Sequence, residues 1–134
     1  MLGNRRGNQT REYRSNYVVF DLETTGTSPK KDGIVEISAL RVRDGEVVEE
    51  FTSLVNPMMH IPYYASQVNG ITDDMVEDEP TIDDILPEFI NFIGEDVLVG
   101  HNIHCFDMKY IWRDCEKVFG KVPNNNYIDR KIVV

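Results

Sequence analysis

Two acidic residues placed two positions apart are the first candidates for chemistry in this sequence. Asp21 and Glu23 follow the apolar run 17–20, which is typical of a buried strand. Because side chains alternate along a strand, both carboxylates point to the same face. Two ionised carboxylates this close repel each other unless a cation lies between them, and oxygen ligands favour Mg²⁺ or Mn²⁺. Two solvated acids at a strand end would show the same pattern.

A third acid, Asp107, ends the segment 100–107, which reads GHNIHCFD. This segment follows the expected buried strand 96–99 and opens a helical pattern, so Asp107 lies in the first helical turn. An acid at that position can simply stabilise the helix dipole. However, if the strands at 17–20 and 96–99 are neighbours in a mixed sheet, their carboxyl ends bring Asp107 towards Asp21 and Glu23. Three converging carboxylates favour a metal site.

The apolar periodicity predicts the order β-β-β-α-β-α-β, in which an antiparallel hairpin leads into a parallel βαβ unit. The fold class is therefore α/β, a mixed sheet with helices on its faces. Asp44-Gly45 is a strong hairpin turn. Thr81 with Asp84 resembles a capping box, and Pro87 indicates a kink or a later helix start. The expected strands are 17–20, 34–43, 46–55, 96–99 and 127–134; short helices are expected near 63–68 and 73–76, and longer ones over 82–93 and 108–119.

Charge and composition limit how this chain could meet a nucleic acid. Its 134 residues fit one domain, and its net charge of −9 would repel a polyanion. From position 44 to 107 there are fifteen Asp or Glu and no Lys or Arg, whereas residues 1–16 form a polar, basic arm or linker. Contact with nucleic acid must then come from metal ions, local donors and aromatic rings.

The cysteines and the hydropathy indicate a cytoplasmic protein. No segment is apolar and long enough to span a membrane, and no signal peptide is recognisable. Cys105 and Cys115, if they share one helix, sit roughly 15 Å apart, too far for a disulfide. They are interpreted as reduced thiols.

The segments 21–26 and 100–107 resemble the first two motifs of the DEDD exonuclease superfamily, in its DnaQ-like branch. That branch includes the epsilon proofreading subunit of bacterial DNA polymerase III and the exonuclease region of PolC-type polymerases. The similarity runs from about residue 17 to 129 and implies an RNase H-like fold for residues 17–134. Between the two motifs, similar segments occur in the same order at 56–57, 61–62, 68–75 and 96–99.

The resemblance implies a metal-dependent 3′→5′ exonuclease that removes terminal nucleotides from single-stranded DNA, with RNA left open as a substrate. It implies two divalent cations, Mg²⁺ or Mn²⁺, held by the catalytic residues Asp21, Glu23 and Asp107, with Asp21 bridging both. It also implies a DNA polymerase subunit or region as a partner. Asn69 departs from the His of many relatives, and core packing is the alternative for Val68 and Phe106. The substrate-binding positions that the resemblance implies are Leu22, Thr24, Thr25, Gly26, Val68, Asn69, Asn102 and Phe106.

The family's third motif, a His followed five residues later by an Asp on a last helix, has no match here. No His follows His104, and Asp129 matches a position after the last core strand that is not the catalytic one. The domain is therefore expected to be incomplete at its C-terminus, to bind at most one cation well and to have little activity. The alternative is a non-catalytic remnant that binds nucleic acid or a partner. An uncovered sheet face and the apolar strand 127–134 predict self-association.

Overall fold

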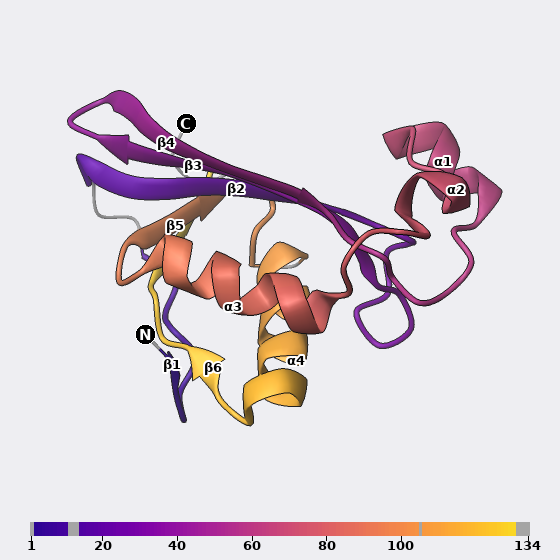
Figure 1. Ribbon diagram of the computed structural model, residues 1–134. Coiled ribbons are helices and arrows are strands. Elements are labelled where there is room, and N and C mark those ends of the chain that lie inside the picture. Colours follow the sequence, from indigo (N-terminus) through magenta and orange to yellow (C-terminus); the bar gives the residue numbers. More distant parts are fainter. Residues whose placement is uncertain (1, 11–13, 105, 131–134) are drawn as a thin grey trace.

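A mixed five-stranded sheet with the order β4-β3-β2-β5-β7 organises the fold (Figure 1). The computed structural model describes residues 2–10, 14–104 and 106–130. The strands are β1 (Leu2–Gly3), β2 (Asn16–Thr24), β3 (Ile34–Arg43), β4 (Glu46–Leu54), β5 (Val97–Gly100), β6 (Val122–Pro123) and β7 (Tyr127–Asp129), and the helices are α1 (Tyr63–Asn69), α2 (Asp73–Val76), α3 (Ile82–Ile93) and α4 (Asp107–Phe119).

The antiparallel part of the sheet forms as the sequence predicts. β2 pairs with β3 and β3 with β4, and Asp44 and Gly45 take φ values of 50° and 83° at the hairpin turn. Two consecutive positive φ values are typical of the tight turn that matches strand twist. β2 runs further than expected, to Thr24, so Asp21 and Glu23 lie inside the strand and not at its end.

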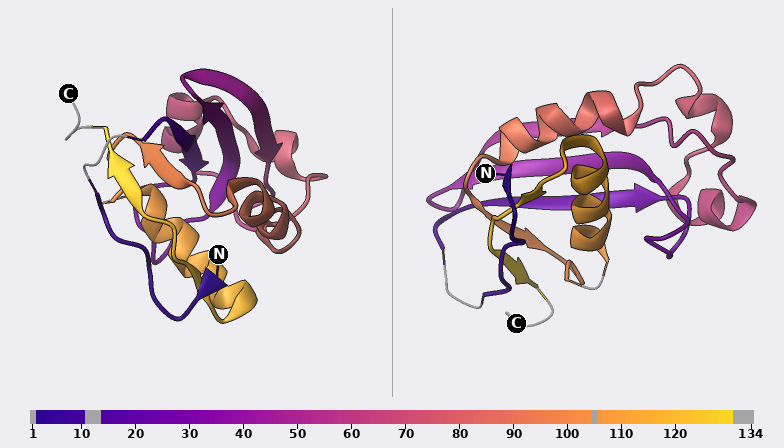
Figure 2. Two further views of the ribbon diagram at one scale, coloured as in Figure 1. Left: turned by 90° about the vertical axis from the view of Figure 1, so that its left-hand side faces the viewer. Right: turned by 90° about the horizontal axis from the view of Figure 1, so that it is seen from below.

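The parallel part of the sheet brings together segments that are far apart in sequence. β5 lies parallel to β2, with Val18 opposite Leu98, and β7 lies parallel to β5, with Val99 opposite Ile128. The expected neighbours are thus confirmed. The helices α3 and α4 both pack on the same face of the sheet (Figures 1 and 2), where Phe20 and Phe89 meet with ring centroids 5.4 Å apart.

Two details of the long helices differ from the sequence expectation. Thr81 is the N-cap residue of α3, but in the described structure its side chain makes no capping hydrogen bond, so the predicted capping box is wrong. α3 begins at Ile82, so Pro87 does not delay its start. Because proline has no N–H, Pro87 cannot donate a hydrogen bond to the Asp83 carbonyl, and α3 therefore lacks this one backbone hydrogen bond. Gly120 ends α4 with a φ of 68°, as predicted.

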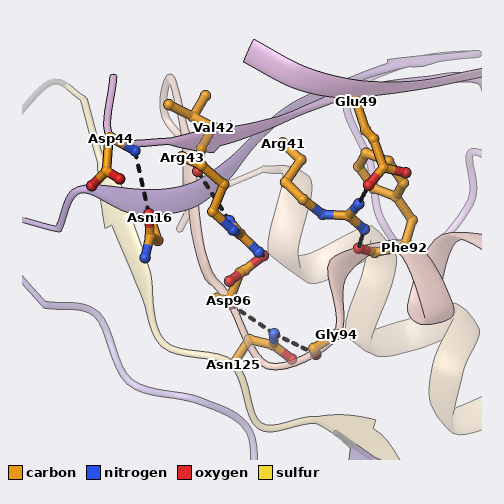
Figure 3. Close-up of polar contacts among 10 residues, drawn as sticks. All are labelled: Asn16, Arg41, Val42, Arg43, Asp44, Glu49, Phe92, Gly94, Asp96 and Asn125. Carbon is orange, nitrogen blue, oxygen red and sulfur yellow. Dashed lines mark hydrogen bonds and ion pairs between the residues drawn. The ribbon is translucent and has the colours of Figure 1, made fainter. Parts of the chain in front are cut away.

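Polar contacts join the loops at the end of the sheet where β2 starts and β3 ends (Figure 3). Arg43 Nη2 lies 2.9 Å from Asp96 Oδ2, and Asn125 Nδ2 donates to the carbonyls of Gly94 at 3.0 Å and Asp96 at 2.8 Å. Arg41 donates to the Phe92 carbonyl at 2.5 Å. These contacts tie the turn after α3 to β3 and to the segment before β7.

The N-terminal arm packs onto the domain along the outer edge of β7. β1 pairs antiparallel with β6. Further along the arm, Tyr127 N–H donates to the Asn8 carbonyl at 3.0 Å, and Thr10 N–H donates to the Tyr127 carbonyl at 2.8 Å. A Cβ on Gly7 would lie 1.7 Å from the Asn125 carbonyl oxygen, so only glycine fits there. The arm therefore adds strand-like pairing at an edge that would otherwise be open.

Removing this arm is expected to make the chain self-associate through β7. Deletion of residues 1–10 should raise the weight-average mass in light scattering, because the β7 edge loses its partner. Gly7→Ala should act in the same direction, while Gly3→Ala should match the wild type, because a Cβ there meets only Asn124 Nδ2, at 4.0 Å. Unchanged mass for both the deletion and Gly7→Ala at micromolar concentrations would refute this.

Residues 131–134 of the predicted last strand lie outside the described residues.

In the described part of the chain, no helix is long and apolar enough to cross a membrane.

Cys115 is a free thiol buried in the main core, and burial, with the charge of Asp114, raises the pKa of this thiol to about 12. Such a thiol packs as a small apolar side chain and is unreactive. Cys105 lies outside the described residues.

Candidate active site

Acidic residues from two parallel strands, and from the helix that follows the strand between them, lie at one edge of the sheet. Asp21 and Glu23 lie in the last half of β2, Asp107 opens α4 after β5, and Asp129 ends β7 opposite Gly100. The carboxyl ends of parallel strands share an edge, which is where ligands bind in open α/β sheets. The sequence predicted three of these acids, and Asp129 is the one it set aside.

Asp107 is the most perturbed acid of the group. Its side chain is almost fully buried, with 2% exposed. Burial, followed by the negative charges of Asp21, Glu23 and Asp129, raises the pKa of Asp107 to about 8. The pKa of Glu23 is also raised, first by partial burial and then by Asp21 and Glu36. The four acids therefore lie within electrostatic range, and without a cation Asp107 is largely protonated at neutral pH.

The donor chemistry of this edge fits a divalent cation, but the side chains do not form a finished coordination sphere. Asp107 Oδ2 is buried and has no hydrogen-bond partner among the residues that the structure describes. A buried oxygen of this kind is costly unless a proton or a cation satisfies it. Nevertheless, within the described ranges no group of three or more His, Cys, Asp or Glu is arranged to hold a metal ion. The fold thus brings Asp21, Glu23 and Asp107 to one edge without closing a three-ligand site.

The turn after β2 is built from internal hydrogen bonds. Thr24 Oγ1 donates to the Gly26 carbonyl at 2.6 Å. The fully buried Thr25 donates through Oγ1 to Asp32 Oδ1 at 3.0 Å and accepts from Gly33 N–H at 3.1 Å. A Cβ on Gly26 would lie 2.4 Å from Asp32 Oδ2. The hydroxyls of Thr24 and Thr25, which the resemblance assigned to substrate, are therefore engaged in holding this turn.

Two residues of α4 hold the same turn, and sequence reasoning missed both. Tyr110 is fully buried, and its hydroxyl donates to the Gly26 carbonyl at 2.8 Å. Arg113 Nη1 donates to the Pro29 carbonyl at 2.6 Å and to the Asp32 carbonyl. Both side chains lie on the helix that Asp107 opens, so α4 fixes the third acid and the turn beside the first two. Their spacing from Asp107 was the only signal in the sequence.

Asp129 contacts the turn that leads to Asp107. Asn102 has a left-handed φ of 55°, and its N–H donates to Asp129 Oδ1 at 3.0 Å. The Asn102 carbonyl in turn accepts from Phe106 N–H at 3.1 Å, directly before Asp107. Asn tolerates this backbone conformation better than most residues. The resemblance implies a substrate role for Asn102, and its backbone also holds the turn before Asp107.

Four of the predicted substrate-binding residues differ in their surroundings. Leu22 is buried in the main core, on the face of β2 opposite to Asp21. Val68 is 86% exposed, which makes core packing wrong for it. Asn69 Nδ2 donates to the Thr24 carbonyl at 3.2 Å, and Phe106 is partly buried against the core. The edge is thus flanked by Val68, Asn69 and Phe106.

Comparison with known sequences places this chain among exonucleases. The RNase T family model, described as exonuclease, matches residues 18–134. A PolC-type DNA polymerase III of Clostridium perfringens is 45% identical over 113 residues, which are 84% of this chain and 8% of that protein. The PolC-type enzyme of Bacillus subtilis is 42% identical over 95 residues, which are 71% of this chain and 6% of that protein. The chain therefore spans less than a tenth of these relatives.

Comparison with solved structures supports the same fold. Exonuclease I of E. coli in complex with a dT13 oligonucleotide superposes with a TM-score of 0.76 at 19% identity, over 87% of this chain and 28% of that one. At this identity the likeness speaks for the fold alone, an RNase H-like mixed sheet, as predicted. The match of the family model over residues 18–134, with the identities to PolC-type polymerases, shows that the chain belongs to the RNase T exonuclease family.

Proposed function

We propose that this chain is the acid-bearing part of a metal-dependent 3′→5′ exonuclease of the proofreading type, acting on single-stranded DNA ends. The observation that carries the proposal is the buried Asp107 carboxyl beside Asp21 and Glu23 at the carboxyl edge of the sheet. The PolC-type relatives support a DNA substrate and a polymerase as the surrounding protein. Exonuclease I, whose fold this chain shares, was solved with a single dT13 strand.

Asp21, Glu23 and Asp107 are the residues that would hold the cation. When bound, a divalent cation at such a site lowers the pKa of a water molecule and stabilises a leaving oxygen. Because the pKa of Asp107 is raised, its carboxyl must lose a proton before it can act as a ligand of the cation. Cation binding is therefore coupled to proton release, and affinity should rise as the pH approaches 8. The turn at Thr24–Gly26, held by Tyr110, keeps the first two acids in place.

A second candidate is a binding module that holds a strand end without cutting it. The observation that favours it is that the described residues form no group of three metal ligands. Both candidates share the carboxylate edge, and they differ in whether a cation and hydrolysis follow. An assay must therefore measure cation binding, strand binding and strand shortening separately.

Asp21→Ala is expected to abolish divalent-cation binding. Calorimetry with Mn²⁺ should give one site of roughly micromolar to millimolar affinity for the wild type, as for oxygen sites with few protein ligands. The variant should show no measurable binding, because one ligand and its charge are gone. Glu50→Ala is the control, because Glu50 is an exposed acid on β4 away from the acidic edge.

The same proteins are then incubated with a 5′-labelled single strand and Mn²⁺. Stepwise shortening from the 3′ end by the wild type, lost in Asp21→Ala, supports the exonuclease. Strand binding without shortening supports the binding module. Equal Mn²⁺ affinity in the wild type and Asp21→Ala would rule out the proposed site.

A further inference from the structure

An exposed apolar surface adjoins the carboxylate edge. Of its residues, only Val68 has been given a role in the candidate active site. Of the nine large apolar side chains that are exposed in the described part of the chain, six lie between positions 58 and 75. Such a concentration marks an interaction site. We call it the α1 surface, and it comprises Met58, Met59, Tyr63, Tyr64, Val68 and Met75.

The α1 surface is continuous with the site. Asn69, the last residue of α1, donates through Nδ2 to the Thr24 carbonyl at 3.2 Å. Met59 Sδ lies 3.6 Å from Thr25 Oγ1. On its inner side α1 is fixed by the buried Ala65, which packs in a small core of its own. Figure 1 shows α1 and α2 beyond the end of the β2–β3–β4 hairpins, next to the turn that follows the acids.

The charge pattern selects among possible occupants. Residues 51–72 contain no Asp, Glu, Lys or Arg, although 28% of the chain is charged. Helix α1 itself carries no cationic side chain for a phosphate, although Lys30 and Lys31 line the pocket beside Met58 and Met59. On α1 a nucleic acid is therefore recognised through its base faces, which stack on aromatic rings without regard to sequence. In a duplex those faces are covered by neighbouring pairs, so the matching ligand is an unpaired strand.

Tyr64 and Val68 form a stripe along α1. They are four residues apart, a little more than one helical turn or about 6 Å along the axis, and so face the same side. Tyr64 is 63% exposed and Val68 is 86% exposed. The stripe ends beside Asn69, which touches the turn after the acids. A tyrosine ring has few rotamers, so ordering it against a base costs little entropy.

We infer that the Tyr64–Val68 stripe of α1 is a stacking platform for the unpaired bases that precede the terminal nucleotide of a single-stranded substrate. The inference rests on the proposed function, since it needs the 3′ end at the carboxylates. With the terminal nucleotide beside Val68 and Asn69, the strand continues along α1, and the next bases meet Tyr64. The platform adds affinity for a strand but none for a single nucleotide.

The test compares strands with mononucleotides. By fluorescence anisotropy, Tyr64→Leu should bind a single-stranded hexamer roughly 5-fold to 100-fold more weakly than the wild type, the range that one base–aromatic stack gives. Competition by dTMP should be unchanged. Tyr64→Phe should retain the hexamer affinity, because the ring stays. Val48→Ala, an exposed apolar residue on β4, is the matched control and should have no effect.

Stacking itself is read with 2-aminopurine placed at each of the last four positions of the hexamer. Quenching in the wild type should peak at an internal position and disappear there in Tyr64→Leu. Because Tyr64 is exposed, the variant should melt like the wild type, which excludes misfolding as the cause.

Three results overturn the inference, and they differ from one another. If Tyr64→Leu binds the hexamer like the wild type while Asp21→Ala still loses Mn²⁺, the platform is wrong and the proposed function stands. If the wild type binds neither Mn²⁺ nor any strand, both fail. If Tyr64→Leu dissociates a wild-type dimer in light scattering without changing hexamer affinity, the α1 surface is a protein interface.

Discussion

Asp107→Asn is expected to stabilise the cation-free protein at pH 9 by several kcal/mol while abolishing cation binding. The folded pKa of Asp107 is raised to about 8 from an ordinary value of 3.8. Below about pH 4 the carboxyl is protonated in both states and costs nothing. As the pH rises towards 8, the unfolded chain releases this proton and the folded chain keeps it, so stability falls through this window. A gap of about four pKa units corresponds to roughly 5 kcal/mol, an order-of-magnitude figure.

Urea denaturation in the presence of a chelator, at pH 4.5 and at pH 9, measures this effect. The wild type should lose stability between the two pH values, and the variant should lose much less, because its amide does not ionise. Glu50→Gln should follow the wild type, since that exposed acid lies away from the carboxylate edge. A variant that is less stable than the wild type at pH 9 would contradict the prediction. Added Mn²⁺ should raise the melting temperature of the wild type and of Glu50→Gln, but not that of Asp107→Asn.

This opposition between stability and function is built into the acidic edge. Asp129 and Asp107 are both buried acids, and the charges of Asp21 and Glu23 add to the repulsion. A protein selected for stability alone would have placed neutral residues there. Perturbed acids gathered at a strand edge are instead typical of sites that bind a cation or move a proton. The cost expected for Asp107 therefore points to function in a way that no contact between side chains does.

Local physics predicted the parts of the site that depend on alternation and helix starts. The two-residue spacing places Asp21 and Glu23 on one face of β2, and the helical pattern after β5 places Asp107 at the start of α4. The same alternation puts Leu22 on the opposite face, where it is buried in the core. The substrate role that the resemblance implies for Leu22 stays a prediction.

The parts that the sequence could not supply depend on contacts between distant residues. Tyr110 meets Gly26 from 84 positions away, and Asn8 meets Asn126 from 118 positions away. Neither contact leaves a periodic signal, because each is fixed only when the sheet has brought the segments together. The same is true of Asp129, whose role depends on the register that sets Gly100 opposite it. The positions of the N-terminal arm, of the turn after β2 and of Asp129 therefore depend on the complete fold, and no local sequence pattern predicts them.

Arg113→Ala is expected to destabilise the protein by about 3–5 kcal/mol, the range for removing one partner of a buried ion pair. Arg113 contacts both oxygens of Asp114, each at 3.0 Å, and the Asp114 side chain is only 4% exposed. The variant leaves that charge buried without its partner. It also removes the donors to the carbonyls of Pro29 and Asp32, which hold the loop after the acids. Urea denaturation at neutral pH gives the free energy of unfolding.

Two further variants show whether burial is the cause. Arg43→Ala breaks the ion pair between Arg43 and Asp96 (Figure 3). The Arg43 side chain is 37% exposed and the Asp96 side chain 19%, so this variant should lose under about 1 kcal/mol of stability. The double variant Arg113→Met with Asp114→Leu should recover much of the lost stability, since no buried charge remains. Equal losses for Arg113→Ala and Arg43→Ala would mean that the α4 pair behaves as a surface pair. The double variant still lacks the Arg113 hydrogen bonds to the Pro29 and Asp32 carbonyls, so the loop after the acids is not held in place. We therefore expect the Mn²⁺ affinity of the double variant to be low even though its free energy of unfolding recovers. This result would distinguish the contribution of Arg113 to stability from its contribution to the cation site.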